Sequence, residues 1–400
     1  MVFTKEERML KVIKKDNKDL DYLPSQISFA DRSKLIELSN SMGFPTLKEM
    51  NDYLQNHLQL TVSLDEAPLF FRNDVEMMKT LEKKGYAGVD LDKKIVYDRW
   101  GVGTEMFSNG FFTIYHPLEG NFRKIKSRHV PSNEEASNFI PEDFNKSVLF
   151  ENDEIAIKKF QAPDPDKEEN TSWMIRDLDT FSGDFLVFTS GYVGIYERTF
   201  HLLGFEKFMV LMYENPSLLG EILDKVTDYK IKMAEKTVKL GFKVGHTGDD
   251  LGTQVSSIFS PGMFRKILRP RMERLWKVWN DANIPIMFHS CGNITDFIPD
   301  LIDMGLSVLE PIQPCMDLEF LKKEYGKYLT FWGGIDTQSI LPFGTPEEVK
   351  KMARDTIRIL GRNGGHIIGP SQDVMEDVPL ENVRALVETI VAERENVLKL

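Results

Sequence analysis

The sequence predicts an α/β protein, a (β/α)₈ TIM barrel with an N-terminal helical extension. From about residue 66 onward, short apolar runs alternate with amphipathic helices, which is the pattern of βαβ units and a parallel sheet. In the second half of the chain these runs end in polar residues, and helix start signals such as Ser260-Pro261 and Thr345-Pro346 stand between them. A length of 400 residues suits one barrel with an extension.

The first 65 residues are predicted to form the helical extension, and residues 66–400 the catalytic barrel. Apolar positions recur at three-to-four spacing in three stretches that Pro24 and Pro45 separate. A further part of the chain, residues 100–160, is aromatic and glycine-containing, and we interpret it as a β-rich insertion or hairpin. The three predicted helical stretches are residues 5–15, 30–42 and 46–56.

Eight barrel strands are expected. Six of them are clear and are listed at the end of this paragraph. A seventh strand is predicted near residues 88–91, and the eighth is expected within residues 100–160. The acidic, polar stretch 163–169 is predicted to be a loop or a lid. The six clearest strands are predicted at residues 185–190, 243–249, 285–289, 307–310, 329–332 and 366–369.

Composition and charge exclude several function classes. The formal net charge is −12, so the field of the protein would repel the phosphates of a nucleic acid. No apolar run approaches the roughly 20 residues that span a bilayer, and the N-terminus does not resemble a signal peptide, so we expect no membrane partner and a cytoplasmic protein. The two cysteines are too few for a disulfide framework, and both are expected to be reduced.

His289 and Cys291 stand two positions apart where a predicted strand runs into a glycine turn. Imidazole and thiolate are preferred zinc donors, and a catalytic zinc needs three protein ligands and an open position. The third ligand is predicted to be Glu310, at the end of the next strand, with Cys315 as the alternative. A purely structural role, with His289 bonded to backbone and Cys291 a small buried apolar residue, is the competing interpretation.

The carboxyl ends of the strands supply further polar residues, which a parallel barrel brings to one face. We predict that Asp250, His246 and Asp336 are catalytic, because carboxylate and imidazole groups can transfer protons to a substrate oxygen. The alternative is that these residues cap turns, which suits Asp336 and Gln338 in particular. The predicted substrate-binding residues are Asp92, Gln254, Gln338 and Ser371.

Three common catalytic motifs are missing from the sequence. No Gly-x-Gly-x-x-Gly opens a helix after a strand, and there is neither a Walker A sequence nor a Gly-x-Ser-x-Gly elbow. Dinucleotide, nucleoside triphosphate and serine hydrolase chemistry therefore have no support.

Several motifs together resemble the uroporphyrinogen decarboxylase superfamily, and more closely its corrinoid-dependent methyltransferase branch. The resemblance runs over essentially the whole chain. No arginine-rich Arg-Gln-Ala-Gly-Arg segment, typical of the porphyrinogen decarboxylases, is present. The motifs include Leu23-Pro24-Ser25-Gln26-Ile27-Ser28-Phe29, Trp100-Gly101-Val102, the loop 249–254, His289-Ser290-Cys291-Gly292-Asn293, the stretch 331–338, the stretch 341–349 and Asp377-Val378-Pro379-Leu380-Glu381-Asn382-Val383.

This resemblance implies a zinc ion and a separate corrinoid protein as partner. Methyltransferases of the superfamily use a His-x-Cys pair and a distant cysteine at the last strand end, where this chain has Ser371-Gln372. A harder ligand set that includes a carboxylate suits an oxygen-bound methyl group better than a thiol.

We therefore predict transfer of a methyl group from an O-methyl donor, a methoxylated aromatic of the guaiacol or veratrole type, to the Co(I) of a corrinoid protein. Aromatic residues such as Phe111, Phe112 and Tyr192 could line the pocket or belong to the core. The chain could also form a homodimer. The alternative function is that of a metal-independent decarboxylase of the uroporphyrinogen type; a corrinoid-binding carrier ranks last, since no Asp-x-His-x-x-Gly motif occurs.

Overall fold

Parallel strands form the centre of the molecule, seen in a computed structural model that describes residues 3–29, 32–44, 46–108, 112–120 and 130–400. One sheet has the order β11-β10-β9-β8-β7, and a second pairs β1 with β6. The later strands are buried at nearly every position, as expected for strands covered on both faces. They are β1 (Leu58–Thr61), β6 (Leu186–Thr189), β7 (Gly245–Gly248), β8 (Ile286–His289), β9 (Leu306–Ile312), β10 (Thr330–Ile335) and β11 (His366–Pro370).

Hydrogen bonds outside the named strands join these two sheets into a ring. Ser25 bridges in parallel to Ile368 of β11 on one side and to Asn56, just before β1, on the other. Between β6 and β7, the N–H of Gly248 donates to the carbonyl of Gly191 at 2.6 Å. The extended segment around Ser25 thus takes the eighth position of the ring, and the predicted (β/α)₈ barrel is confirmed.

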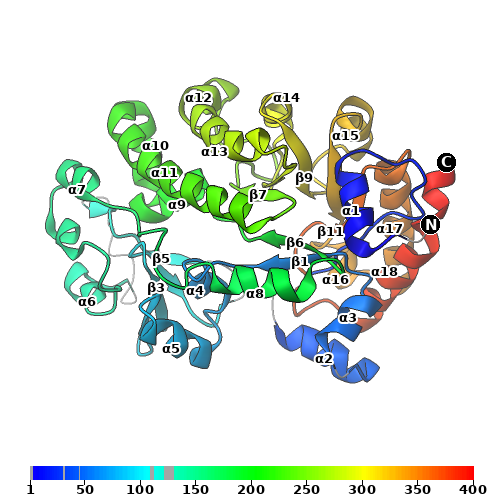
Figure 1. Ribbon diagram of the computed structural model, residues 1–400, viewed down its shortest axis with the longest axis horizontal. Helices are drawn as coiled ribbons and strands as arrows, with labels where there is room; N and C mark the ends of the chain where they lie inside the picture. Colours follow the sequence, from blue (N-terminus) through cyan, green and yellow to red (C-terminus); the bar gives the residue numbers. More distant parts are fainter. Residues whose placement is uncertain (1–2, 30–31, 45, 109–111, 121–129) are drawn as a thin grey trace.

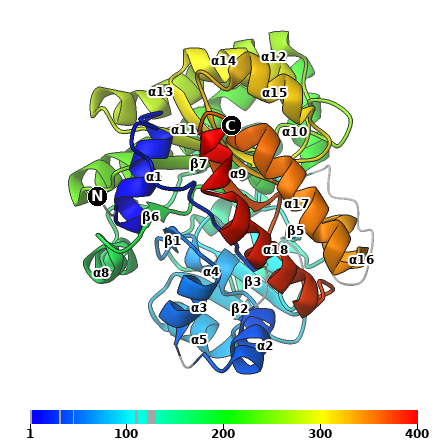
Figure 2. The ribbon, with the colours of Figure 1, turned by 90° about the vertical axis from the view of Figure 1, so that its right-hand side faces the viewer.

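Helices surround this ring (Figure 1), and the view in Figure 2 shows α17 and α18 side by side along one flank. Their N-termini carry the signals noted in the sequence: the Ser260 side chain caps α12, and a capping box formed by Thr345 and Glu348 opens α17. The helices are α1 (Lys5–Ile13), α2 (Arg32–Met42), α3 (Leu47–Tyr53), α4 (Ala67–Phe70), α5 (Val75–Lys83), α6 (Asn133–Ser137), α7 (Asp153–Lys159), α8 (Ser172–Phe181), α9 (Ile195–Leu203), α10 (Phe205–Glu214), α11 (Pro216–Leu240), α12 (Pro261–Ile267), α13 (Arg269–Asp281), α14 (Ile298–Asp303), α15 (Leu318–Tyr325), α16 (Ile340–Phe343), α17 (Pro346–Gly361) and α18 (Leu380–Glu393), with the 3₁₀ turns η2 (Lys146–Phe150), η3 (Thr295–Phe297) and η4 (Asn396–Lys399).

A separate antiparallel sheet lies at the opposite end of the molecule from α17 and α18 (Figure 1). Its order is β2-β3-β4-β5, and the strands are β2 (Ala87–Asp90), β3 (Ile95–Asp98), β4 (Gly103–Glu105) and β5 (Thr113–Tyr115). The seventh barrel strand predicted near residues 88–91 was therefore wrongly placed: β2 turns back into β3 and pairs with it antiparallel. The eighth strand expected within residues 100–160 belongs to the same sheet, because β4 and β5 continue this meander.

The N-terminal part contributes two members of the barrel as well as helices. The predicted helices correspond to α1, α2 and α3, but the Ser25 segment and β1 lie in the ring. A division of the chain near residue 65 stays a proposal. The structure adds that the first barrel strand precedes this point.

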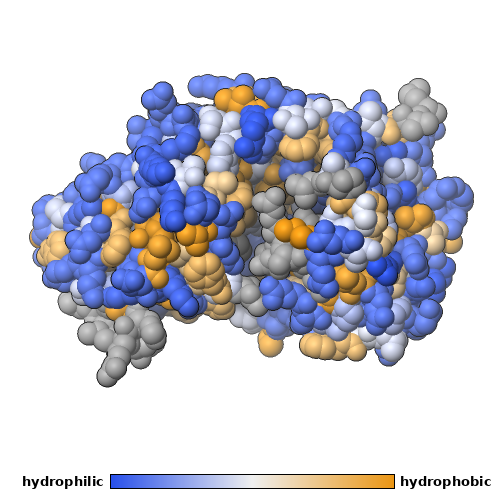
Figure 3. Space-filling view, turned by 90° about the horizontal axis from the view of Figure 1, so that it is seen from below, coloured by the Kyte–Doolittle hydropathy of each residue, from blue (hydrophilic) through white to orange (hydrophobic). Residues whose placement is uncertain are grey.

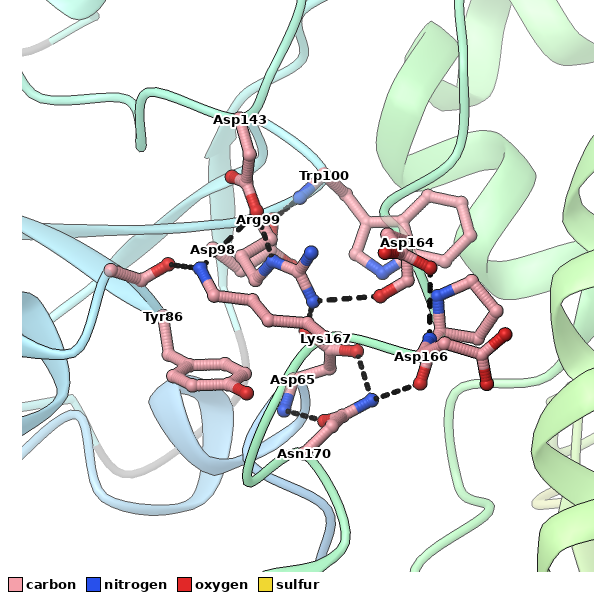
Figure 4. Close-up of polar contacts among 12 residues, drawn as sticks. Asp65, Tyr86, Asp98, Arg99, Trp100, Asp143, Asp164, Asp166, Lys167 and Asn170 are labelled. Carbon is pink, nitrogen blue, oxygen red and sulfur yellow. Dashed lines mark hydrogen bonds and ion pairs between the residues drawn. The ribbon is translucent and has the colours of Figure 1, made fainter.

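The loop of residues 163–169 is held by a buried polar network (Figure 4). Arg99, which follows β3, forms ion pairs with Asp65 and Asp143, and its guanidinium also donates to the carbonyl of Asp164 at 3.2 Å. Asn170 donates to Asp65 at 2.7 Å. The stretch predicted to be a loop or a lid is thus a loop that contacts Arg99, just after the antiparallel strand β3.

The surface is mostly hydrophilic in the view of Figure 3, with apolar patches on both sides of a central hollow. This mixture agrees with a chain in which 28% of the residues are charged. Among the described residues, no helix combines the length and the apolar character that crossing a bilayer would need.

Candidate metal centre

Polar side chains gather where four barrel strands end. Asp250 follows β7, His289 ends β8, Glu310 lies in β9 and Gln372 follows β11. Because the strands are parallel, their carboxyl ends meet at one face, where hydrogen bonds join His289 to Glu310 and Cys291 to both Asp250 and Gln372. This face carries the chemistry of the candidate site.

Asp250, His289 and Cys291 form a group that could hold one metal ion. Each offers one ligand atom, and these atoms lie within 4.8 Å of one another. The His289 Nε2 is 3.5 Å from a carboxylate oxygen of Asp250 and 3.6 Å from the Cys291 sulfur. Three protein donors, one oxygen, one nitrogen and one sulfur, match the ligand number and types of a catalytic zinc, which keeps its fourth position for water or substrate.

Glu310 contacts the other side of the His289 ring. Its carboxylate lies 2.8 Å from Nδ1, whereas Asp250 and Cys291 face Nε2. One imidazole cannot bring ligands on its two nitrogens to the same ion, and Asp250 rather than Glu310 shares the Nε2 side of the ring with Cys291, so the identity of the third ligand stays a proposal. A carboxylate on the far nitrogen of a ligating histidine orients the ring. Cys315, the alternative, lies outside the group.

Two carboxylates flank the His289 imidazole, and the three groups shift one another's pKa. Burial would raise the pKa of Glu310, yet the charge of His289 holds that pKa at about 2. Burial would also raise the pKa of Asp250, but the hydrogen bond from His289 keeps it below its usual value. Burial works to lower the pKa of His289, and the negative groups around it, Glu310 foremost, raise it well above normal. A proton on His289 or a metal ion would each satisfy the two carboxylates.

His246 leaves one ring nitrogen available in the site. Its Nδ1 contacts the carbonyl of Thr189 at 2.9 Å, and a carbonyl can only accept, so Nδ1 carries the proton. Its Nε2 is buried without a hydrogen-bond partner among the described residues and lies 3.8 Å from Glu310. The ring of Tyr192 packs edge-on against both His246 and His289, at 4.8 and 4.9 Å between ring centroids. Tyr192 therefore forms an aromatic wall of the site.

Two glycines bring the loops of Asp250 and Cys291 into backbone contact. Gly292 has a φ of +84°, and a Cβ there would overlap the carbonyl group of Gly252. The N–H of Asn293 donates to the carbonyl of Thr253 at 2.7 Å across the same contact. The sequence His-x-Cys-Gly thus approaches its neighbour loop closely enough that position 292 has no space for a side chain.

We expect Gly292→Ala to separate these loops and to weaken metal binding, because the methyl group overlaps backbone that cannot rotate away. Gly241→Ala is the matched control, since Gly241 has a similar φ of +88° with nothing within 4 Å of a Cβ. The control should lose about 1 kcal/mol of stability from the left-handed backbone alone. Thermal melts and zinc titrations of both variants check this, and equal behaviour of the two would contradict it.

The remaining predicted residues do not join the His289 cluster. Both carboxylate oxygens of Asp336 accept hydrogen bonds at the start of α16, as the capping alternative expected. Asp92 is exposed in the turn between β2 and β3. Gln254 and Gln338 are also exposed, while Ser371 is buried and lies 3.2 Å from the hydroxyl of Thr337.

Two glutamines next to Cys291 were expected among the polar residues at the strand ends but were assigned no role in the predicted site. Gln313 follows β9 and Gln372 follows β11, and their position at strand ends was the available signal. Of the predicted pocket aromatics, Tyr192 lies at the site, whereas Phe112 is 58% exposed and Phe111 is outside the described residues.

Fold and site together define a (β/α)₈ barrel with an Asp-His-Cys group at the carboxyl ends of its strands. A family model for uroporphyrinogen decarboxylase (URO-D) matches residues 189–392, which is just over half of the chain. The chain therefore belongs to the uroporphyrinogen decarboxylase family, and the predicted family is confirmed. The match includes every strand from β7 to β11 and all members of the Asp-His-Cys group.

Curated relatives include both methyltransferases and decarboxylases. A methylated-thiol:coenzyme M methyltransferase of Methanosarcina mazei is 25% identical over 191 residues, 47% of this chain and 48% of that protein. The methylcobamide:CoM methyltransferase MtaA of Methanosarcina barkeri is 25% identical over 186 residues, covering 46% and 52%. A uroporphyrinogen decarboxylase of Syntrophotalea carbinolica is 25% identical over 183 residues, covering 45% and 50%. The matched region spans about half the length of these relatives.

A solved methyltransferase structure from Methanosarcina mazei shares the fold. Its TM-score to this chain is 0.60 at 17% sequence identity, and the match covers 98% of this chain and 99% of that one. At this identity the likeness concerns the fold, and it extends over the N-terminal part as well as the barrel.

Proposed function

We propose that this chain is a corrinoid-dependent methyltransferase that moves a methyl group from an O-methyl donor, a methoxylated aromatic of the guaiacol or veratrole type, to the Co(I) of a corrinoid protein. The observation that carries the proposal is the Asp250, His289 and Cys291 group at the open end of the barrel. Similarity to the two coenzyme M methyltransferases supports the methyl transfer, and the name of one of them includes a methylcobamide donor.

In this proposal Asp250, His289 and Cys291 hold a zinc ion, and Glu310 orients His289. A zinc ion held there would supply Lewis-acid stabilisation of the negative charge that develops on the oxygen leaving the methyl group. His246 offers its free Nε2 to a hydroxyl of the substrate, and Tyr192 gives an aromatic ring a face to pack against.

The transfer itself needs the cobalt in line with the methyl carbon. The bond between carbon and oxygen breaks with its electron pair left on oxygen, and the two electrons of Co(I) form the new bond to carbon. The corrinoid protein must therefore approach the face where the strands end, since the Asp-His-Cys group lies there.

The donor set favours oxygen over sulfur as the methyl carrier. The group contains one thiolate and one carboxylate, whereas the ligand set of a His-x-Cys pair and a distant cysteine would contain two thiolates. Hard ligands favour oxygen donors at a metal. Because the names of two relatives include methylated thiols or coenzyme M, S-methyl compounds must be tested as donors beside the O-methyl compounds.

The test is incubation with a Co(I) corrinoid protein and a panel of methoxylated phenols, methanol, methylamines and methylated thiols, following methyl-Co(III) by absorbance. We expect methyl transfer from a methoxylated phenol, and its loss together with zinc in Cys291→Ala. Cys315→Ala is the matched control, because Cys315 lies outside the metal group, and it should keep both. Full activity of Cys291→Ala, or failure with every donor, would refute the proposal.

Decarboxylation without a metal is the second candidate function. The decarboxylase of Syntrophotalea carbinolica is as similar to this chain as the methyltransferases are, at 25% identity. Zinc analysis of the purified protein separates the two, since the decarboxylase proposal requires no metal and the methyltransferase proposal requires one ion in each chain.

A further inference from the structure

The sulfur of Cys291 faces two side-chain amides as well as the imidazole of His289. The Nε2 of Gln372 lies 3.0 Å from this sulfur, and the Nε2 of Gln313 lies 3.6 Å from it. We propose that Gln313 and Gln372 donate hydrogen bonds to the Cys291 thiolate and thereby make a metal ion at this site a harder Lewis acid, suited to an oxygen-bound methyl donor. This inference rests on the proposed function and assigns these two residues a part in choosing the substrate class.

The orientation of the Gln313 amide is set by the backbone around it. Its Oε1 accepts from the N–H of Gly292 at 2.8 Å, and its Nε2 donates to the carbonyl of Ser371 at 3.3 Å. A flipped amide would set N–H against N–H and oxygen against oxygen, so the N–H group must face Cys291. Gln313 is 6% exposed, which means that its donor cannot turn to solvent instead.

Gln372 approaches the same sulfur from the open side of the site. Its Oε1 accepts from the N–H of Asp373 at 3.3 Å, which directs its Nε2 to Cys291. Gln372 is exposed, whereas Gln313 is buried beneath the loop. The two amides come from different strand ends, β9 and β11, and both reach the sulfur that follows β8.

Hydrogen bonds to a metal-bound sulfur draw electron density away from the metal. The same effect tunes iron–sulfur clusters, where hydrogen bonds to sulfur help to set the reduction potential. A thiolate with two amide donors gives less charge to the ion than a free thiolate would, so the ion keeps more of its attraction for a hard oxygen. The glutamines thus add to the effect of the single carboxylate ligand.

Cobalt(II) in place of zinc makes this effect visible, because a cobalt–thiolate bond produces a charge-transfer band whose energy follows the electron donation of the sulfur. Gln313→Leu and Gln372→Leu should each move this band to longer wavelength. Gln313→Leu should also weaken metal binding about 10-fold, as loss of such a partner does elsewhere. Gln161→Leu, at an exposed glutamine in the loop after α7, is the matched control and should change neither quantity.

The outcomes separate this inference from the proposed function. A native protein without any cobalt–thiolate band would overturn the metal site and the inference with it. A native band whose position is the same in both glutamine variants would overturn the inference alone, even if binding weakened, because a merely structural role changes affinity without changing sulfur donation. If Gln313→Leu does not fold, the exposed Gln372→Leu decides by itself.

Discussion

Replacing Asp250 by asparagine is expected to weaken zinc binding by on the order of a few hundred-fold, whereas Glu310→Gln should weaken it only about 10-fold. A ligand carries roughly a quarter of the 10–16 kcal/mol typical of a protein zinc site, or about 2.5–4 kcal/mol. A carboxylate that orients a ligand contributes less. Both substitutions keep a side-chain oxygen, so the amide introduced at position 250 can still accept from the Cys291 N–H, and the amide introduced at position 310 can still accept from the Nδ1 of His289.

Competition with a chromophoric chelator measures both affinities. Asp336→Asn is the matched control, because Asp336 also stands at a strand end but its carboxylate accepts hydrogen bonds from backbone N–H groups at the start of α16, and it should bind zinc like the native chain. The reverse order, with Glu310→Gln the more damaging change, would return Glu310 to the ligand set that the sequence predicted. Similar losses at Asp250 and Asp336 would argue against a defined metal centre.

The barrel could be predicted from the sequence where each strand carries its own pattern. The runs that became β6 to β11 are apolar, end in polar residues and alternate with capped helices, all of which are local features. The first strands lack them. The Ser25 segment is extended only through its bridges to Ile368 and Asn56, and the run at residues 87–90 is as apolar in an antiparallel sheet as it would be in a barrel. The structure of both segments depends on the strands with which they pair, and a local sequence pattern does not reveal those partners.

The candidate metal centre could likewise be predicted only in part from the sequence. His289 and Cys291 could be predicted as a pair, because they are two positions apart and therefore lie at the same bend at the end of β8. The proposed third ligand could not, since Asp250 follows β7 and Glu310 lies in β9, the two strands next to β8, and the two carboxylates differ in which nitrogen of His289 each one faces. Ring orientation depends on tertiary packing, here including Tyr192 against the imidazole.

Arg99→Met is expected to lower the free energy of unfolding by about 3–5 kcal/mol, the usual cost of removing one partner of a buried ion pair. The side chains of Arg99 and Asp65 are 1% and 0% exposed, and burial already raises the pKa of Asp65 despite the nearby guanidinium. Without Arg99 this carboxylate keeps Asn170 and Tyr229 as partners but loses its counter-charge. The network in Figure 4 would then no longer fasten the antiparallel sheet to the barrel.

Urea denaturation of the native chain and the variant measures this loss. Arg176→Met is the matched control: Arg176 also pairs with an aspartate, Asp177, but is 61% exposed, so its removal should cost no more than about 1 kcal/mol. Adding Asp65→Asn to Arg99→Met should recover part of the loss, because the double variant buries no unpaired charge. If Arg99→Met costs as little as the control, the network does not stabilise this junction, and the contact of the antiparallel sheet with the barrel must rest on apolar packing and on other polar contacts such as the Arg198–Asp98 ion pair.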